Sequence, residues 1–272
     1  MRANIVTRAT NVVLLLAAVC TASCKGPPTR EPLLIAGSTT MREYLEGLEE
    51  EFERRNPTID VVFGGGGTAA GAMAVKKGAV DVAMMGRDLS ASEDDLTLRN
   101  YLLARDSVVV ITNPSNPVDG LSLAQLKAIY LGEVRSWKDV GGQDSPIVVY
   151  EREWSDRSRK SFGALALSGD SDGVVQSAKT APSADEMISA IRSNPSAIGY
   201  LPMNRMSKDV KNLRIDGVEV SRITVLSGRY PLTRSFYLVV SNPPRSAEKF
   251  VEFALSADGE GILAKNGLIP TF

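Results

Sequence analysis

Short apolar runs alternate along the chain with segments in which apolar residues recur every three or four positions. The runs place Val, Ile and Leu on consecutive positions, which is typical of strands covered on both faces of a sheet. The periodic segments predict amphipathic helices around 41–52, 123–130 and 250–254. The predicted strands are 33–36, 59–63, 80–84, 107–112, 147–150, 197–201, 223–226 and 235–240.

The alternation of strands and helices predicts an α/β fold with mainly parallel sheets. Several helix starts carry a capping-box pattern, in which Ser or Thr is followed three residues later by Glu or Gln. The pairs are Thr40 with Glu43, Ser90 with Glu93, Ser122 with Gln125, and Ser183 with Glu186.

Residues 1–24 have the pattern of a signal peptide. Arg2 and Arg8 precede an apolar run at 12–19 that is too short to cross a bilayer, and small residues precede Cys24. The small residues before this Cys resemble a bacterial lipobox, although Thr21 stands where Leu is usual. We expect an exported protein, in the periplasm or on the outer face of a bacterial membrane, anchored by lipid at Cys24. A peptide cleaved without lipidation and an uncleaved anchor are the alternatives.

Composition excludes several classes of function. The 272 residues have a net charge of −1 and lack a basic run, so we expect no nucleic-acid partner. The chain contains no His, which excludes Ser-His-Asp and Cys-His catalysis. Its two Cys, Cys20 and Cys24, both lie in the N-terminal segment, so zinc is not expected in the body of the chain. We therefore expect no enzyme activity, no catalytic residue, no metal and no cofactor.

Three predicted strand-to-helix junctions are rich in Gly, Ser or Thr. They are Gly-Ser-Thr-Thr at 37–40, four glycines and Thr68 at 64–68, and the segment 155–158. Free backbone N–H groups and the positive end of a helix dipole meet at such junctions, which suits an anion. Helix capping alone is the other interpretation of each. The four glycines match neither a P-loop nor a dinucleotide-binding fingerprint.

An arginine cluster follows the predicted strand at 147–150. Arg152, Arg157 and Arg159 alternate there with Glu and Asp residues. A guanidinium group presents a planar fork of donors that suits a tetrahedral oxyanion. A solvated segment of salt bridges would have the same composition.

Longer blocks of the sequence resemble a known family. They are SVVVITNPSNP (107–117), LSLAQLKAIYLG (121–132) and SWKDVGG (136–142), with shorter matches at 197–200, 230–234 and 253–259. These blocks are similar to those of the PstS-type phosphate-binding proteins. The resemblance extends from about residue 33 to residue 272.

The resemblance implies a two-lobe fold of the type II periplasmic-binding-protein kind, with hinge strands and a ligand cleft between the lobes. Lobe one would comprise 33–110 plus 236–272 and lobe two 111–235, after a signal peptide at 1–24 and a tether at 25–32. The implied partners are phosphate or a related oxyanion and the membrane permease of an ABC importer. We expect a monomer. A diverged fold that serves as scaffold, adhesin or sensor without phosphate transport is the alternative.

The resemblance also implies a ligand site, from which this chain departs in places. Relatives carry Ser-Gly-Thr where this chain has Asp156-Arg157-Ser158, and Ser or Asp within the segment where it has Met85-Gly86-Arg87. We expect the ligand-binding residues to be Ser38, Thr39, Thr40, Gly67, Thr68, Arg87, Arg152, Asp156, Arg157 and Ser158.

Asp156 has two interpretations. A carboxylate beside a bound anion is unfavourable unless a proton lies between them, so it could favour protonated phosphate over sulfate. Alternatively, Asp156 caps the following helix and pairs with Arg152 or Arg159.

Overall fold

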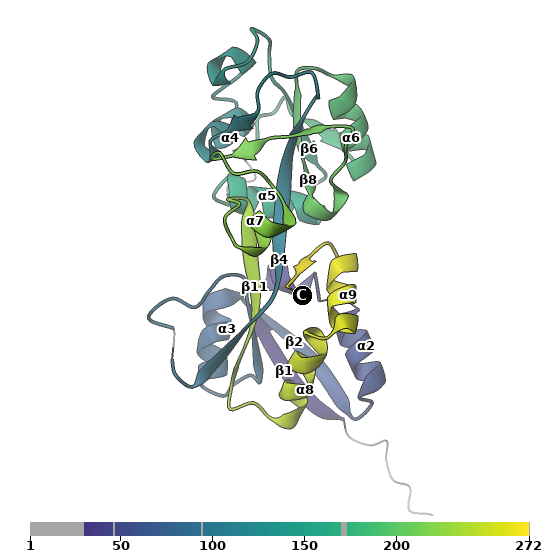
Figure 1. Cartoon of the computed structure of the whole chain (residues 1–272). Helices are drawn as coiled ribbons and strands as arrows, with labels where there is room; N and C mark the ends of the chain where they lie inside the picture. Colours follow the sequence, from purple (N-terminus) through teal and green to yellow (C-terminus); the bar gives the residue numbers. More distant parts are fainter. Residues whose placement is uncertain (1–29, 46, 94, 170–172, 272) are drawn as a thin grey trace, which may run out of the picture.

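The computed structural model describes residues 30–271 except 46, 94 and 170–172, so the predicted signal peptide and Cys24 lie outside the described residues. Two lobes lie one above the other in Figure 1, connected by β4 (Leu98–Thr112) and β11 (Thr233–Ser241). Each lobe combines helices with a sheet, which confirms the predicted two-lobe α/β fold. Within the described ranges, no helix has both the length and the apolar composition needed to cross a bilayer.

The first lobe, the lower one in Figure 1, contains the strand order β2-β1-β3-β11-β4. β1 is parallel to β2 and β3, whereas β11 is antiparallel to β3 and β4. The other elements of this lobe are β1 (Glu31–Gly37), α1 (Thr39–Arg42), α2 (Leu48–Arg55), β2 (Ile59–Gly66), α3 (Gly67–Lys76), β3 (Val82–Met85), α8 (Arg245–Ala254), α9 (Ala257–Lys265) and β12 (Ile269–Pro270).

The second lobe continues the sheet in the order β4-β8-β6-β7. β6 is parallel to β7 and β8, and β4 is antiparallel to β8. Its elements are β5 (Gly120–Leu121), α4 (Leu123–Tyr130), the 3-10 helix η1 (Trp137–Val140), β6 (Val148–Arg152), α5 (Arg157–Ala166), β7 (Lys179–Ala181), α6 (Ala184–Ser193), β8 (Ala197–Pro202), the 3-10 helix η3 (Met203–Arg205), β9 (Lys211–Asn212), β10 (Arg214–Ile215) and α7 (Arg222–Leu226).

β4 and β11 explain why the sheet is mixed instead of mainly parallel. The chain leaves the first lobe along β4 and returns along β11, so the two strands run in opposite directions (Figure 1). Thr233 of β11 lies opposite Ser107, and from Val108 onward β4 pairs with β8. One long strand therefore belongs to both lobes. The predicted lobe boundaries at 110/111 and 235/236 stay a prediction.

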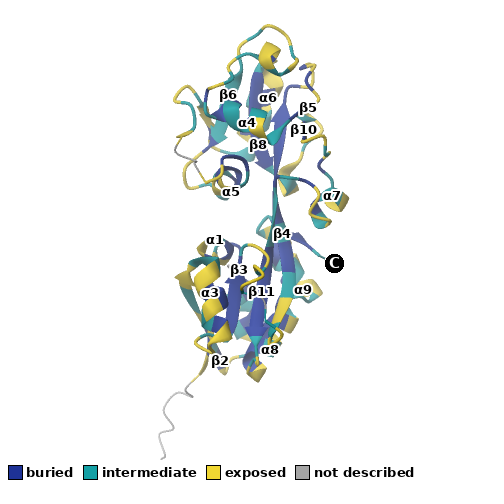
Figure 2. Ribbon diagram, turned by 90° about the vertical axis from the view of Figure 1, so that its left-hand side faces the viewer, coloured by how far each residue is buried: buried dark blue, intermediate teal, exposed yellow. Residues whose placement is uncertain are grey.

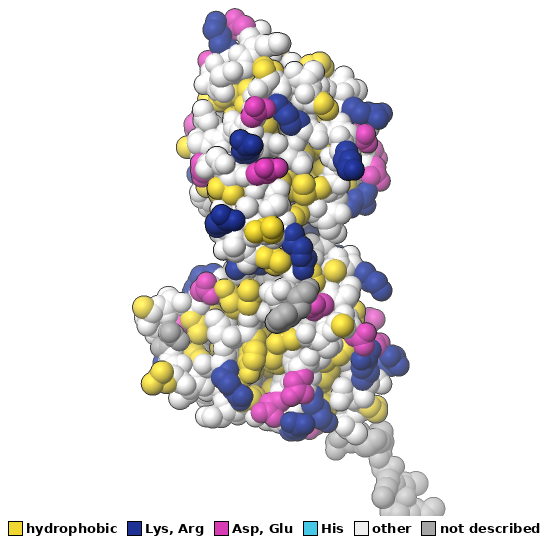
Figure 3. Space-filling model, in the orientation of Figure 1, with side chains coloured by type: hydrophobic (Ala, Val, Ile, Leu, Met, Phe, Trp, Pro, Cys, Tyr) yellow, Lys and Arg dark blue, Asp and Glu magenta, His cyan; other side chains and the backbone are white. Residues whose placement is uncertain are grey.

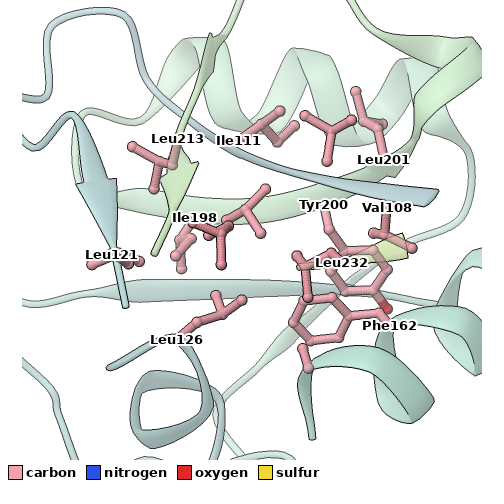
Figure 4. Packing of buried hydrophobic residues seen from close by; sticks show 14 of the residues in the cluster. Val108, Ile111, Leu121, Leu126, Phe162, Ile198, Tyr200, Leu201, Leu213 and Leu232 are labelled. Atoms are coloured by element: carbon pink, nitrogen blue, oxygen red, sulfur yellow. The ribbon is translucent and has the colours of Figure 1, made fainter. Parts of the chain in front are cut away.

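Each lobe has its own hydrophobic core, seen as dark central strands in Figure 2. In the second lobe, the rings of Phe162 and Tyr200 stack with centroids 4.1 Å apart (Figure 4). In the first lobe, Phe52 of α2 meets Phe250 of α8 edge to face at 5.1 Å. Separate cores allow each lobe to keep its packing while the connecting strands flex.

Two of the predicted elements differ in the structure. Residues 223–226, predicted as a strand, lie in α7, because Ser221 and Thr224 form a reciprocal capping box that starts a helix. The helix predicted around 41–52 is two helices, α1 and α2, and α2 begins after Gly47, which adopts a left-handed φ of 80°.

Of the four predicted capping boxes, two lie at helix starts in the structure and two do not. Ser122 with Gln125 forms a complete box at α4, and Ser183 accepts from the Glu186 N–H at the start of α6. At α1 the N-cap is Ser38 instead of Thr40. Ser90 and Glu93 do hydrogen bond, but residues 90–93 form no helix.

Candidate functional site

The ends of β1, β2 and β3 bring Ser38, Thr68 and Gly86 together, with Thr68 in the first turn of α3, which follows β2 directly. The Gly86 N–H donates to Thr68 Oγ1 at 3.1 Å. A Cβ added to Gly86 would lie 3.3 Å from Ser38 Oγ and 3.5 Å from Thr68 Oγ1. Neighbouring parallel strands end at the same edge of a sheet, which explains why residues 18 to 48 positions apart meet here.

Close backbone packing fixes the position of the Ser38 loop. Gly37 has a φ of 135°, and a Cβ there would lie 2.2 Å from the Met84 carbonyl oxygen. A Cβ on Gly71 of α3 would lie 2.7 Å from the Gly37 Cα. The Ser38 N–H then donates to the Met84 carbonyl at 2.8 Å. β1, β3 and α3 therefore approach more closely than any side chain would allow.

In the second lobe, Arg152 ends β6 and is only 7% exposed. Its Nη1 donates to the Ala181 carbonyl at 3.0 Å, and its Nη2 donates to Asp156 Oδ2 at 2.5 Å. Its Nε is buried and has no hydrogen-bond partner among the described residues. Arg152 thus keeps a buried donor without a partner, as Arg105 and Arg159 also do at their Nε atoms.

Asp156 is the N-cap of α5. Its Oδ1 accepts from the Ser158 N–H at 2.8 Å and from the Ser158 hydroxyl. Burial by itself raises the pKa of Asp156, but hydrogen bonds from Arg152 and Ser158 outweigh burial and hold the pKa below its usual value. Capping and pairing with Arg152, one of the two interpretations from the sequence, is the arrangement present here.

The other arginines predicted from the sequence have different environments. Arg157 extends from α5 to the first lobe, where it donates to the Glu43 carbonyl at 3.2 Å. Arg159 stays in the second lobe and pairs with Glu151 at 2.5 Å. Arg87 is half-exposed and pairs with Glu93 at 2.6 Å. Of these three arginines, Arg157 is the one that hydrogen bonds across the waist between the lobes within the described residues.

A cavity of about 410 Å³ lies at this waist and is lined by both lobes. Figure 3 shows basic side chains on both sides of the waist. Four basic and two acidic side chains line the cavity, and the excess positive charge suits an anion. The basic ones are Arg152, Arg157, Arg205 and Lys265, and the acidic ones are Asp106 and Asp156.

The predicted site residues fall into two groups. The second-lobe group, Arg152, Asp156, Arg157 and Ser158, lines the cavity. The first-lobe group does not line it, so a ligand contact from these residues stays a prediction. This group comprises Ser38, Thr39, Thr40, Gly67, Thr68 and Arg87.

The residues predicted from the sequence do not include most of the cavity lining, among them the basic Arg205 and Lys265 and the buried Tyr44 and Asp106. Asp106 pairs with Arg234 at 2.7 Å, and both side chains are largely buried. The available signals were an acid just before the apolar run 107–112 and an arginine at the end of the block 230–234. Neither signal identifies the other residue as its partner.

Two α/β lobes, joined by paired strands and enclosing a cationic cavity, define a two-lobe solute-binding protein. The model of the PBP superfamily domain matches residues 22–258. A similar protein, the phosphate-binding protein PstS of Bacillus subtilis strain 168, is 30% identical over 247 residues, covering 88% of this chain and 80% of that protein.

Two solved structures are also similar. An ABC-type phosphate transport receptor from Vibrio cholerae has a TM-score of 0.70 at 28% identity, covering 88% of this chain and 99% of that one. A substrate-binding protein from Clostridium perfringens with bound phosphate has a TM-score of 0.53 at 30% identity, with the same coverage of 88% and 99%. The chain belongs to the PstS-type phosphate-binding proteins of the PBP superfamily.

Proposed function

We propose that this chain binds phosphate, or a closely related oxyanion, in the cleft between its lobes and delivers it to the membrane permease of an ABC importer. The observation that carries the proposal is Arg152. Its largely buried guanidinium lines the cationic cavity beside the first turn of α5, and a guanidinium has five N–H donors for an anion. The names of the relatives support phosphate as the ligand.

Binding would require no covalent bond to be made or broken. Charge-assisted hydrogen bonds contribute about 1.5–3 kcal/mol each. Three or four of them would support micromolar affinity, which needs about −8 kcal/mol. Arg152 would supply one or more, and Ser38 at the start of α1 and Thr68 in the first turn of α3 would supply hydroxyls from the other lobe.

The proposal extends to the rest of the chain. Residues 33–110 plus 236–272 and residues 111–235 would move as the two lobes. The protein would be exported and held at a membrane by lipid on Cys24, and would act as a monomer. The tether, predicted at 25–32, would end before Glu31, because residues 31 and 32 pair with β2 as the start of β1. None of these steps needs an enzyme activity.

Calorimetric titration tests the proposal. Phosphate, arsenate, sulfate and molybdate would be added separately to the purified protein. We expect phosphate to bind with micromolar or lower Kd, and arsenate to be the nearest competitor because it has the same shape and protonation. The absence of heat with all four anions, together with no thermal shift, would contradict the proposal and favour a scaffold, adhesin or sensor.

Asp156 provides a prediction on selectivity. An ionised carboxylate beside the site repels fully charged sulfate more than phosphate, which can place a proton between itself and the carboxylate. In Asp156→Asn we expect sulfate to compete with phosphate on the order of tenfold better. Asp258→Asn, an exposed carboxylate paired with Arg55, is the control. If Asp156→Asn leaves the ratio of the two Kd values unchanged, Asp156 only caps α5 and pairs with Arg152.

A further inference from the structure

Four polar side chains from four separate segments meet between the lobes. Ser161 of α5 donates to Asp106 Oδ2 at 2.6 Å and accepts from Arg234 Nη2 at 2.9 Å. The Tyr44 hydroxyl lies 3.2 Å from Ser161 Oγ and 3.3 Å from Asp106 Oδ2. Arg234 Nε also donates to Asp106 Oδ2, at 2.9 Å. Tyr44 belongs to the first lobe and Ser161 to the second, so their contact joins the lobes.

The cluster is buried and its groups are bonded to one another. Asp106, Ser161 and Tyr44 are 3%, 0% and 4% exposed. Burial, followed by the charge of Asp106, raises the pKa of Tyr44 to about 12, so the hydroxyl keeps its proton and can donate. A buried polar group that loses its hydrogen-bond partner destabilises the protein, because water does not replace that partner. The cluster therefore favours the one relative position of its four segments in which all its groups are bonded.

The same face of α5 makes further contacts with the segment that carries Tyr44. Arg157 lies with its Cζ 5.4 Å from the Tyr44 ring centroid, and Lys160 Nζ lies 2.7 Å from Glu43 Oε1. Residues 157, 160 and 161 share one helix face because their spacings are three and four. Figure 2 shows α5 at the base of the second lobe, facing α1.

Contacts within the first lobe hold Tyr44 in place. The Asn266 side-chain amide, just after α9, donates to the Tyr44 carbonyl at 2.9 Å. The Tyr44 ring packs 5.5 Å from Phe236 of β11. The first lobe therefore presents the Tyr44 hydroxyl from a fixed position, and α5 docks against it.

We propose that Tyr44 is a positioning residue for ligand binding. Through Ser161 and the Asp106–Arg234 pair it holds the first turn of α5, with Arg157 and Ser158, against the first lobe. The oxyanion then binds in a cleft whose two lobes are already held near each other. Tyr44 itself need not touch the ligand. The effect on affinity rests on the proposed function, whereas the effect on lobe position does not.

Hydroxyl deletions test this proposal. In Tyr44→Phe and Ser161→Ala we expect the phosphate Kd to rise roughly three- to tenfold, mainly through faster dissociation. The double variant should lose less affinity than the sum of the two single losses, because both remove the Tyr44–Ser161 contact and both hydroxyls bond the same Asp106 oxygen. A Tyr44→Phe Kd within about 1.5-fold of wild type, or additive effects in the double variant, would overturn the proposal.

Tyr130→Phe is the matched control. The Tyr130 hydroxyl is also buried, but it donates to the Tyr150 carbonyl at 3.2 Å within the second lobe. Its removal should lower the urea midpoint of unfolding and leave the phosphate Kd unchanged. An equal loss of affinity in Tyr130→Phe would assign the effect of Tyr44→Phe to general destabilisation and reject the positioning role.

Small-angle X-ray scattering separates the two proposals. Without ligand, Tyr44→Phe should have a larger radius of gyration than wild type, because the lobes are less firmly held together. An unchanged radius in Tyr44→Phe would contradict the positioning role even if phosphate binds. Wild-type protein that binds no oxyanion would contradict the proposed function and leave the scattering comparison valid.

Discussion

Arg152→Ala is expected to raise the Kd for phosphate by about 30-fold to several thousandfold, equivalent to roughly 2–5 kcal/mol. The guanidinium is 7% exposed and lines the cavity, so its removal leaves the charge of a bound anion desolvated and unpaired. The same substitution leaves Asp156 without its cation, which adds repulsion towards the anion. Calorimetric titration of phosphate measures the effect directly.

Two further variants show whether the loss of affinity is specific to the guanidinium at position 152. Arg152→Lys keeps the charge but not the planar fork, so we expect an intermediate Kd. Arg54→Ala removes a mostly exposed arginine that pairs with Glu51 on α2, and it should bind as wild type does. Urea unfolding of each variant shows whether it is folded. A folded Arg152→Ala protein with a Kd within twofold of wild type would show that the site is assigned wrongly.

Asp106→Asn is expected to lower the free energy of unfolding by about 3–5 kcal/mol, the usual cost of removing one partner from a buried ion pair. The Asp106 side chain is 4% exposed and that of Arg234 15%, so the Arg234 charge would remain in a site with little water. Urea unfolding, monitored by fluorescence and far-UV circular dichroism, measures the change.

The control is an exposed pair of the same type. Asp144 lies 3.2 Å from Lys138 with both side chains more than two-thirds exposed, and we expect Asp144→Asn to change stability by less than about 1 kcal/mol. Replacement of both Asp106 and Arg234 by apolar residues should cost less than the sum of the single changes. A loss below about 1 kcal/mol in Asp106→Asn would show that the Arg234 charge finds water or another partner.

Much of the fold follows from local patterns. Apolar runs identify most of the strands, and a hydroxyl residue followed by Gln or Glu marks the starts of α4 and α6. The glycine-rich stretch that spans the end of β2 and the start of α3, and the stretch at the start of α5, follow from local composition and the preceding apolar runs. These features depend on residues within a few positions of one another, which one sequence displays fully.

The exceptions show where local patterns fail. Residues 223–226 are apolar enough for a strand, yet Ser221 and Thr224 start a helix there. For an apolar run this short, periodicity does not distinguish a strand from a buried helix. The mixed direction of the sheet likewise depends on β4 and β11 pairing across more than a hundred residues.

The sequence by itself determined that this chain is an α/β protein with strand-end loops and arginines suited to an oxyanion. It also contained the blocks that resemble its family. Tertiary structure alone decided that Asp156 pairs with Arg152, that Arg157 crosses to the other lobe, and that Tyr44 and Ser161 meet Asp106 and Arg234. Helix periods and caps act over a few residues, whereas the Tyr44–Ser161 contact joins side chains 117 positions apart. Such a contact exists only once both lobes have folded, so no local pattern encodes it.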